Sequence, residues 1–435
     1  MQIKNFAELE YLTRFELIKH ESQHSRLNFV ASVAVGGEGN FFARVGEIIS
    51  VSLDDGVTIF CGRVEAIELE RAFNALRVHA SCVSLSIETD EQLKTRIFHN
   101  PDKKISDVLE QSRLKLENCG LKLSDEISSK KYEGVLLQNQ ETNFNFIARL
   151  ARALNSRLWI IDTMTKAEIR LDKRVGNSPR KIGAERLIYI RQGKRGGRRT
   201  MTVRTEDYFD LGAVVTVETD SRDMTQYVIV GLRAELTDER YLFEYELDEL
   251  EAPPAVETNA PTLAKTIKLH ATVKSVDDPE HRGRVQVVFD DKFIEDMDQK
   301  NPLWIEYRSP YVGTEGGIVF MPDKGDAIEV LFGNEEVYAV STLRKKPLGA
   351  ECRNVVDKYI GNNFEQRIFW KEKSLELLSS KNKITMNDKA IELTVGSSKL
   401  VMNDKAIELT VGGSKLTMTD KTVKIKTVGG ELEMN

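Results

Sequence analysis

The C-terminal part of the chain repeats one short pattern, and this repeat limits the possible folds more than any other feature. Methionine recurs every 16 residues, at Met386, Met402, Met418 and Met434. One period upstream, the segment WKEKSLELLSSKNKIT, which begins at Trp370, aligns with MNDKAIELTVGSSKLV. A fixed period is typical of solenoids and arrays. Residues 370–435 therefore predict a regular stack of about four copies of one unit.

Inside each copy, apolar and polar side chains alternate. Ile391, Leu393 and Val395 share one face of an extended segment, whereas Glu392 and Thr394 share the other. A period of two, interrupted by Gly, Ser, Asn and Asp, predicts two short strands in each copy. The residues expected on the inward apolar face are Leu375, Leu377, Ile384, Ile391, Leu393, Val395, Leu400, Met402, Ile407, Leu409, Val411, Leu416 and Met418. The same pattern predicts Leu432 and Met434 at the tip end of the repeat.

One such unit is too thin to fold alone, because its few inward side chains offset too little of the conformational entropy that ordering costs. Partners must supply the missing apolar contacts and backbone hydrogen bonds. Either one chain coils on itself as a β-solenoid, or several chains wrap into an intertwined prism. Few copies, short strands and a single apolar face favour the prism, most simply with three chains. A calcium-binding β-roll is disfavoured, since acidic residues recur every 16 positions rather than every nine.

Upstream of the repeat, residues 263–347 read as a small β unit. Five short runs of alternating residues are separated by Gly, Pro and Asp turns, which predicts a barrel of the OB type. The Pro- and Ala-rich segment 251–262 predicts a linker, so we expect the barrel to begin as a separate body. Residues 348–369 are expected to connect the barrel to the repeat.

Three ordered segments of this barrel resemble the VgrG and phage tail hub-spike family of contractile injection systems. They are DDP followed by GRV from Asp277, W followed by SPYVG from Trp304, and FMPDKGDAIEV from Phe320. The residues that carry the resemblance are Asp278, Pro279, Gly283, Trp304, Pro310, Gly325 and Asp326. In that family a repeat also follows the barrel, as it does here.

The N-terminal residues 1–250 mix strands and helices. Phe144, Ile147 and Leu150 lie on one face of an expected helix, which Thr142 or Asn143 can cap, and residues 158–161 follow as a buried strand. A similar string joins two barrel-like halves in VgrG and phage hub proteins. The basic segment 193–199 predicts a solvated loop or a contact with an acidic partner surface, rather than a nucleic-acid site.

The residues offer little support for catalysis. His20 and His24 stand four residues apart, which could place two metal ligands on one helical face, but their charged surroundings favour a solvated pair. His281 is expected to face solvent in a turn. No nucleophile elbow, phosphate-binding loop or dinucleotide fingerprint occurs, and about 20 residues between Lys346 and Trp370 leave no room for an enzyme domain. We therefore expect no enzyme activity and no cofactor.

Composition and cysteine use place the chain among ordinary soluble proteins. The net charge is −6, with no bias toward nucleic acid. Four separated cysteines, Cys61, Cys82, Cys119 and Cys352, read as reduced and mostly buried thiols. No signal-peptide pattern or long apolar run occurs, so we expect synthesis in the cytoplasm.

The resemblance implies a mainly β protein with some α: a hub of tandem barrel-like halves, an OB-type barrel and an intertwined triple-stranded β-helix or prism. It implies a homotrimeric, membrane-puncturing spike that adapts a hexameric Hcp-like inner tube and the baseplate to a trimeric needle. Expected partners also include a PAAR-type tip protein, effectors and the target cell envelope, without nucleic acid. Such a spike is assembled in the cytoplasm and delivered outside or into target cells. The alternatives are an OB protein that binds carbohydrate or nucleic acid and is oligomerised by its tail, and an enzyme hidden in the N-terminal half.

Overall fold

The computed structural model forms two compact units, Met1–Leu343 and Arg344–Asn435. It describes residues 1–6, 9–33, 41–72, 75–112, 118–132, 134–176, 178–195, 198–218, 225–250, 267–290, 292–311, 318, 320–333, 336–343, 352–354 and 356–434. The expected linker at 251–262 lies outside these residues. None of the helices that the structure describes combines the length and the apolar character needed to cross a bilayer.

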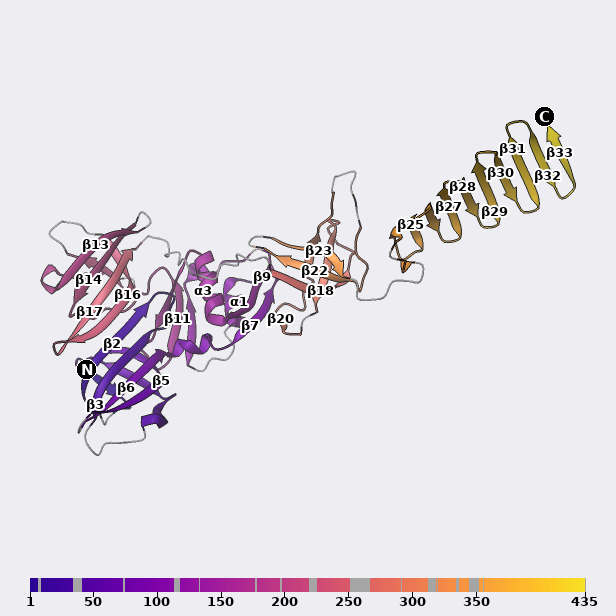
Figure 1. Cartoon of the computed structure of the whole chain (residues 1–435). Helices are drawn as coiled ribbons and strands as arrows, with labels where there is room; N and C mark the ends of the chain where they lie inside the picture. Colours follow the sequence, from indigo (N-terminus) through magenta and orange to yellow (C-terminus); the bar gives the residue numbers. More distant parts are fainter. Residues whose placement is uncertain are drawn as a thin grey trace. The chain divides into compact units, whose positions relative to one another are not determined.

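A 12-stranded sheet forms the larger part of the hub in the first unit (Figure 1), and β7–β11 (residues 93–172) form the rest of the hub. Its first half contains β1 (Gln2–Lys4), β2 (Leu9–His20), β3 (Arg26–Val33), β4 (Ile48–Ser52), β5 (Thr58–Ala72) and β6 (Ala75–Ser84). Its second half contains β12 (Arg180–Ile182), β13 (Tyr189–Arg195), β14 (Arg198–Thr205), β15 (Val214–Val217), β16 (Gln226–Thr237) and β17 (Arg240–Glu249). Short 3-10 turns accompany them: η1 (Phe41–Arg44), η2 (Leu85–Thr89) and η3 (Ala184–Arg186).

The two halves of this sheet have the same strand order. The first reads β4-β5-β6-β3-β2 and the second β15-β16-β17-β14-β13, and β2 joins the halves by pairing with β16. The prediction of a solvated loop at 193–199 is wrong for the described residues, because Gly193–Arg195 end strand β13 and Arg198–Arg199 begin strand β14. The described residues of this basic segment pair antiparallel at the edge of the sheet.

A smaller α/β layer lies between the two halves in sequence. It contains β7 (Leu93–Phe98), α1 (Ile105–Ser112), β8 (Cys119–Leu123), α2 (Asp125–Ser128), β9 (Leu136–Thr142), α3 (Asn143–Ala153), β10 (Arg157–Ile161) and β11 (Ala167–Asp172). The predicted helix is confirmed: the Thr142 hydroxyl accepts from the Asn145 amide at 3.2 Å, and the predicted apolar face is buried. Arg157 of β10 is buried and donates to Glu21 at 2.6 Å and to Asp248 at 2.7 Å, which ties both halves to this layer.

Five strands close the predicted barrel: β18 (Ile267–Ser275), β19 (Arg284–Phe289), β21 (Trp304–Tyr307), β22 (Ala327–Phe332) and β23 (Val337–Leu343). Alternate residues such as Val273, Val285 and Ile328 point inward and are buried. A further strand, β20 (Ile294–Asp296), pairs with β7 of the hub instead of joining the barrel. The mainly β fold with a hub and a central barrel is therefore as the sequence predicts.

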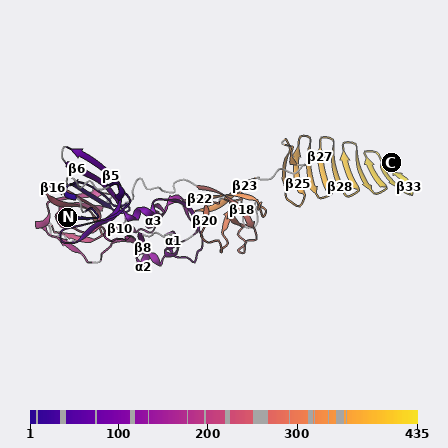
Figure 2. The ribbon, with the colours of Figure 1, turned by 90° about the horizontal axis from the view of Figure 1, so that it is seen from below.

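Ten strands form the second unit: β24 (Lys358–Gly361), β25 (Gln366–Lys371), β26 (Ser374–Ser379), β27 (Asn382–Asn387), β28 (Ala390–Val395), β29 (Ser398–Asn403), β30 (Ala406–Val411), β31 (Ser414–Thr419), β32 (Val423–Thr427) and β33 (Gly430–Met434). Each pairs antiparallel with its neighbour in the chain, and Figures 1 and 2 show them side by side in one layer. We expected partner chains to supply backbone hydrogen bonds, but this sheet makes its ladder within one chain. The intertwining of three chains stays a prediction.

Candidate functional site: the apolar face of the repeat sheet

The register of the repeat sheet aligns its leucines in one row. Leu393 stands opposite Leu400, Leu400 stands opposite Leu409 on the next strand, and Leu409 stands opposite Leu416. A second row contains Met386, Ile391, Met402, Ile407, Met418 and Val423, each opposite the next. Because directly opposite residues point to the same side of a sheet, both rows lie on one face. We call this surface, formed by the inward residues predicted above, the apolar face.

The predicted residues at the ends of the sheet belong to the same face. Leu375 and Leu377 stand opposite Met386 and Ile384. At the C-terminal end, Leu432 stands opposite Ile425, and Met434 stands opposite Val423. Val395 and Val411 lie two positions after Leu393 and Leu409, at the ends of β28 and β30, so they belong to the same face. The structure thus brings every predicted spike and tip residue together on one side of one sheet.

No described residue of the second unit covers the apolar face. Leu393 is 38% exposed, Leu409 39% and Ile407 42%, although residues of this kind are usually buried. The exposure recurs on successive strands, so it is a continuous patch rather than isolated apolar residues. Patches of this type mark interaction surfaces.

The opposite face of the repeat sheet is charged. Lys399 contacts Glu392 at 2.7 Å, and one period later Lys415 contacts Glu408 at 2.8 Å. Partial burial raises the pKa of Glu376, but hydrogen bonds from Lys371 and Lys383 outweigh it and leave this pKa below its usual value. Cross-strand ion pairs of this kind hold register and keep this face in water.

Tight turns set the spacing of the strands. The Asn403 side-chain oxygen accepts from the amides of Lys405 and Ala406, both at 2.9 Å, and Asn387 makes the corresponding bonds one period earlier. The turns after β28 and β30 use Gly396 and Gly412, whose φ angles of 58° and 57° favour glycine. The turn residues of the repeat therefore return the chain directly to the next strand.

In the barrel, Asp278 organises the turn between β18 and β19. It is 6% exposed, and its carboxylate accepts from the amides of Glu280, Arg282 and Arg284 at 2.9 to 3.2 Å. The Arg284 guanidinium donates to it at 2.7 Å and holds the pKa of this carboxyl well below its usual range. Asp278 thus acts as a structural residue of the turn.

The other barrel residues of the motif lie around the strand ends. Gly283 and Gly325 have φ angles of 75° and 91°, and the Asp326 carboxylate accepts from the Asp323 amide at 3.0 Å. Trp304 begins β21 and is half-buried, whereas Pro279 and Pro310 are exposed. These positions match turns and strand starts, and they do not converge on one cavity.

A buried polar cluster connects the barrel to the hub, and sequence reasoning missed it. Arg96 of β7 is fully buried and donates to Glu295 of β20 at 2.8 Å and to Asn143 at 2.9 Å. His99 contacts Asp296 at 3.0 Å. Burial raises the pKa of Asp296, but the hydrogen bond to His99, the hydrogen bond from the Asp298 amide and the charge of His99 together outweigh it, so the pKa lies below its usual value. No sequence signal pairs residues 199 positions apart.

The histidine pair does not lie on a helix. His20 ends β2 and His24 follows in a turn, where its Nδ1 lies 2.7 Å from the Ser86 hydroxyl and its ring contacts Phe144. The prediction of a solvated pair is therefore wrong for His24, whose side chain is 9% exposed. His281 is exposed as predicted. Within the described part of the chain, no three His, Cys, Asp or Glu side chains are placed to hold a metal ion.

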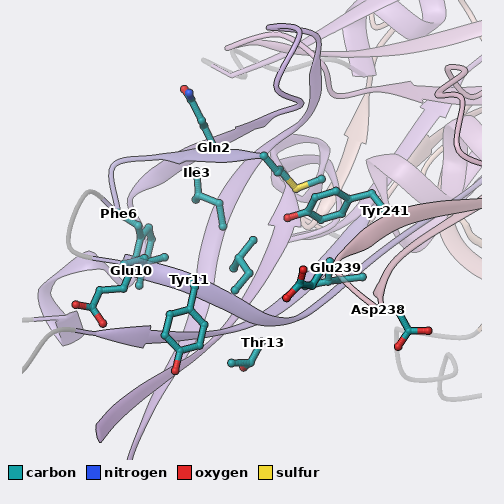
Figure 3. A pocket seen from close by; sticks show the side chains of 13 residues that line it. Gln2, Ile3, Phe6, Glu10, Tyr11, Thr13, Asp238, Glu239 and Tyr241 are labelled. Carbon is teal, nitrogen blue, oxygen red and sulfur yellow. The ribbon is translucent and has the colours of Figure 1, made fainter.

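The four cysteines are free, and three are buried as predicted; Cys352 is half-buried. A hollow of about 720 Å³ opens beside β1 and β2. Figure 3 shows Glu10 and Tyr11 on one side of it and Asp238 on the other. No histidine or cysteine is among the described residues that line it.

Comparisons with known proteins support the architecture. Residues 269–341 match the family model of the type VI secretion system/phage-baseplate injector OB domain. The E. coli c3393 protein, described as a type VI secretion component similar to the T4 bacteriophage tail proteins gp27 and gp5, has 13% identity and a TM-score of 0.59, covering 79% of this chain and 99% of that chain. The sequence has no significant match among curated proteins.

Chains of the Francisella PdpA–VgrG complex are also similar. The lidded form gives 8% identity and a TM-score of 0.58, covering 96% of this chain and 76% of that chain. The lidless form gives 7% identity and a TM-score of 0.56, covering 97% of this chain and 93% of that chain. Residues 269–341 are thus similar to the OB domain of contractile injectors, and the chain over most of its length has the fold of type VI secretion spike and phage tail proteins.

Proposed function

We propose that this chain is a hub and spike of a contractile injection apparatus, in which three copies close their apolar faces into one needle. The single observation that carries the proposal is the continuous, uncovered apolar face of the repeat sheet. A partner for this face must present apolar rows with the same spacing over the same length. A further copy of this chain does so by construction, because every strand carries the same pattern.

The apolar face also gives the needle a mechanical role. The successive strands of the repeat pair with one another within each chain, so association along the apolar face has to cover only side chains. Burying the apolar face against two further copies leaves the Lys and Glu side chains on the outside, as a water-exposed needle requires. A stiff trimeric rod would concentrate the force of contraction on a small area of the target cell envelope.

The remaining partners follow from the same proposal. The hub, with two equivalent halves in each chain, would present six halves to a hexameric Hcp-like inner tube and to the baseplate. The exposed end of β33, with Leu432 and Met434, would receive a PAAR-type tip protein, and effectors would travel with the spike. The complex would assemble in the cytoplasm and be delivered outside or into target cells, without catalysis by this chain.

The mass and shape of the purified full-length protein test this function. We expect a trimer by native mass spectrometry, and a compact body with a thin rod in negative-stain images. A monomer whose residues 370–434 are already protected from hydrogen exchange would contradict the proposal. Binding of polysaccharide or oligonucleotide to the barrel would instead favour a binding function for the OB domain.

A further inference from the structure

The two hub halves correspond residue by residue, because both carry the same irregularity. In β5 the register with β6 shifts between Val64 and Ala66. In β16 the register with β17 shifts between Ile229 and Gly231. A bulge in equivalent strands of two sheets with the same strand order fixes their alignment. Ala66 therefore corresponds to Gly231.

This alignment extends across the sheet to the edge strands β2 and β13. In the first half, Val64 pairs with Cys82, Cys82 with Leu27, and Leu27 with Leu17. In the second half, Ile229 pairs with Leu247, Leu247 with Met201, and Met201 with Gln192. Leu17 of β2 thus corresponds to Gln192 of β13. By the same count, Glu16–His20 corresponds to Arg191–Arg195.

Inside the chain, the edge strand of the first half is already paired. Residues Glu16–His20 of β2 pair antiparallel with Gly231–Glu235 of β16. Arg233 contacts Glu16 across this junction at 2.7 Å. Next to it, Phe15 is 1% exposed and packs edge-on against the Tyr241 ring, with 5.8 Å between centroids. This junction is therefore a complete strand-to-strand contact with a buried aromatic anchor.

In the part of the chain that the structure describes, the corresponding edges have no strand partner. In β5, pairing with β4 ends at Arg63, so Ala66–Glu70 has no described strand on the side where β16 receives β2. Among the described strands, β13 pairs only with β14. Ile190 holds the position that Phe15 holds in β2, yet it is 41% exposed. The second junction is thus present as two separate, open edges.

These two edges have opposite charge. Strand β5 carries Glu68 and Glu70 in the open segment and Glu65 directly before it, and all three are exposed. Strand β13 carries Arg191 and Lys194, which are also exposed. Opposite charges on neighbouring strands stabilise pairing, whereas each edge would repel another copy of itself. This complementarity favours contact of β13 with β5 over contact of either edge with itself.

We propose that β13 of one copy adds antiparallel to the open edge of β5 in a second copy of this chain. Copying the register of the internal junction places Arg191 opposite Glu70, Gly193 opposite Glu68 and Arg195 opposite Ala66. Glu68 then has a glycine directly across from it and Arg191 diagonally beside it. The contact is head-to-tail, so three copies form a ring when each is rotated by one third of a turn without a shift along the axis. It rests on the proposed function, because three copies with two halves each give six equivalent halves.

Cysteine cross-linking of the full-length chain tests the register. Glu70→Cys and Arg191→Cys are combined in a Cys352→Ser background, which removes the one native thiol that is not buried. Directly opposite side chains lie close enough for a disulfide or a short bis-maleimide bridge. The matched control combines Glu70→Cys with Gln192→Cys, because a slip of one residue turns the side chain to the other face. Adding Glu68→Lys to the first pair supplies a charge test.

We expect covalent dimers and trimers from the 70/191 pair at a yield on the order of tenfold above the control pair. Glu68→Lys should lower this yield several-fold at low salt and less at high salt. A protein that is trimeric by native mass but cross-links no better than the control overturns the strand pairing and leaves the spike function intact. A protein that stays monomeric overturns both, so the two failures are distinguishable.

Discussion

Aspartate in place of Leu393 and Leu409 is the sharpest perturbation of the apolar face. Full burial of a leucine contributes about 1.5–3 kcal/mol, so the 38% and 39% still exposed represent roughly 0.8 kcal/mol for each side chain. Three copies with two leucines each give roughly 5 kcal/mol, or more than three factors of ten in the trimer dissociation constant. Each buried, unpaired carboxylate adds a penalty of several kcal/mol. We therefore expect Leu393→Asp/Leu409→Asp to be monomeric.

Mass photometry at nanomolar concentration and native mass spectrometry measure this change directly. The matched control is Thr394→Asp/Thr410→Asp, which places the same charges on the opposite face of the same two strands. There the new carboxylates lie across from Lys399 and Lys415, so the control should remain trimeric. An intact trimer in the leucine double variant would refute the assignment of the apolar face as the contact between copies.

Three further perturbations follow from the structure. The pKa of Asp278 is lowered in the folded barrel, so its contribution to stability is present above the unfolded-state pKa of about 4 and is lost as the pH falls further. Unfolding measured from pH 7 to pH 2 should show that Asp278→Asn is less stable than Asp277→Asn at neutral pH. The stability of Asp278→Asn should also depend less on pH. Arg96→Met should destabilise the hub–barrel contact by roughly 2 kcal/mol, which is less than the cost of breaking a fully buried pair because Glu295 is half exposed. Hydrogen exchange of the β20 amides measures this change. Gly412→Ala should cost about 1 kcal/mol in denaturant unfolding of the repeat, unlike Gly429→Ala, whose φ is not left-handed.

The repeat was predictable because its signal is local. Alternation of apolar and polar residues within five positions fixes a strand, and Asn403 or Gly396 fixes a turn. What the sequence did not reveal is that these turns are tight enough to pair each strand with its chain neighbour. The sequence alone therefore predicts backbone hydrogen bonds to other chains, whereas in the structure only the side chains of the apolar face lack partners within the sheet.

The barrel was predictable for the same reason, and its attachment to the hub was not. Asp278 and Gly325 stand in turns whose partners lie within a few residues. Arg96 and Glu295 meet only because β20 leaves the barrel and pairs with β7. Single-sequence reasoning recognises an arginine and a carboxylate as surface residues unless a topology brings them together.

This chain contains two kinds of repetition, and only one of them is visible in the sequence. In the repeat sheet the side chains repeat, so every strand presents the same apolar row. In the hub, Leu17 and Gln192 hold equivalent positions in the two halves, and so do Phe15 and Ile190, although the side chains within each pair differ. What repeats there is strand order and a bulge, which depend on backbone pairing. The proposed ring of equivalent halves needs only that backbone equivalence, so the side chains at each junction are free to differ. The junction inside one chain has an apolar anchor, and the junction proposed between two chains would have opposite charges.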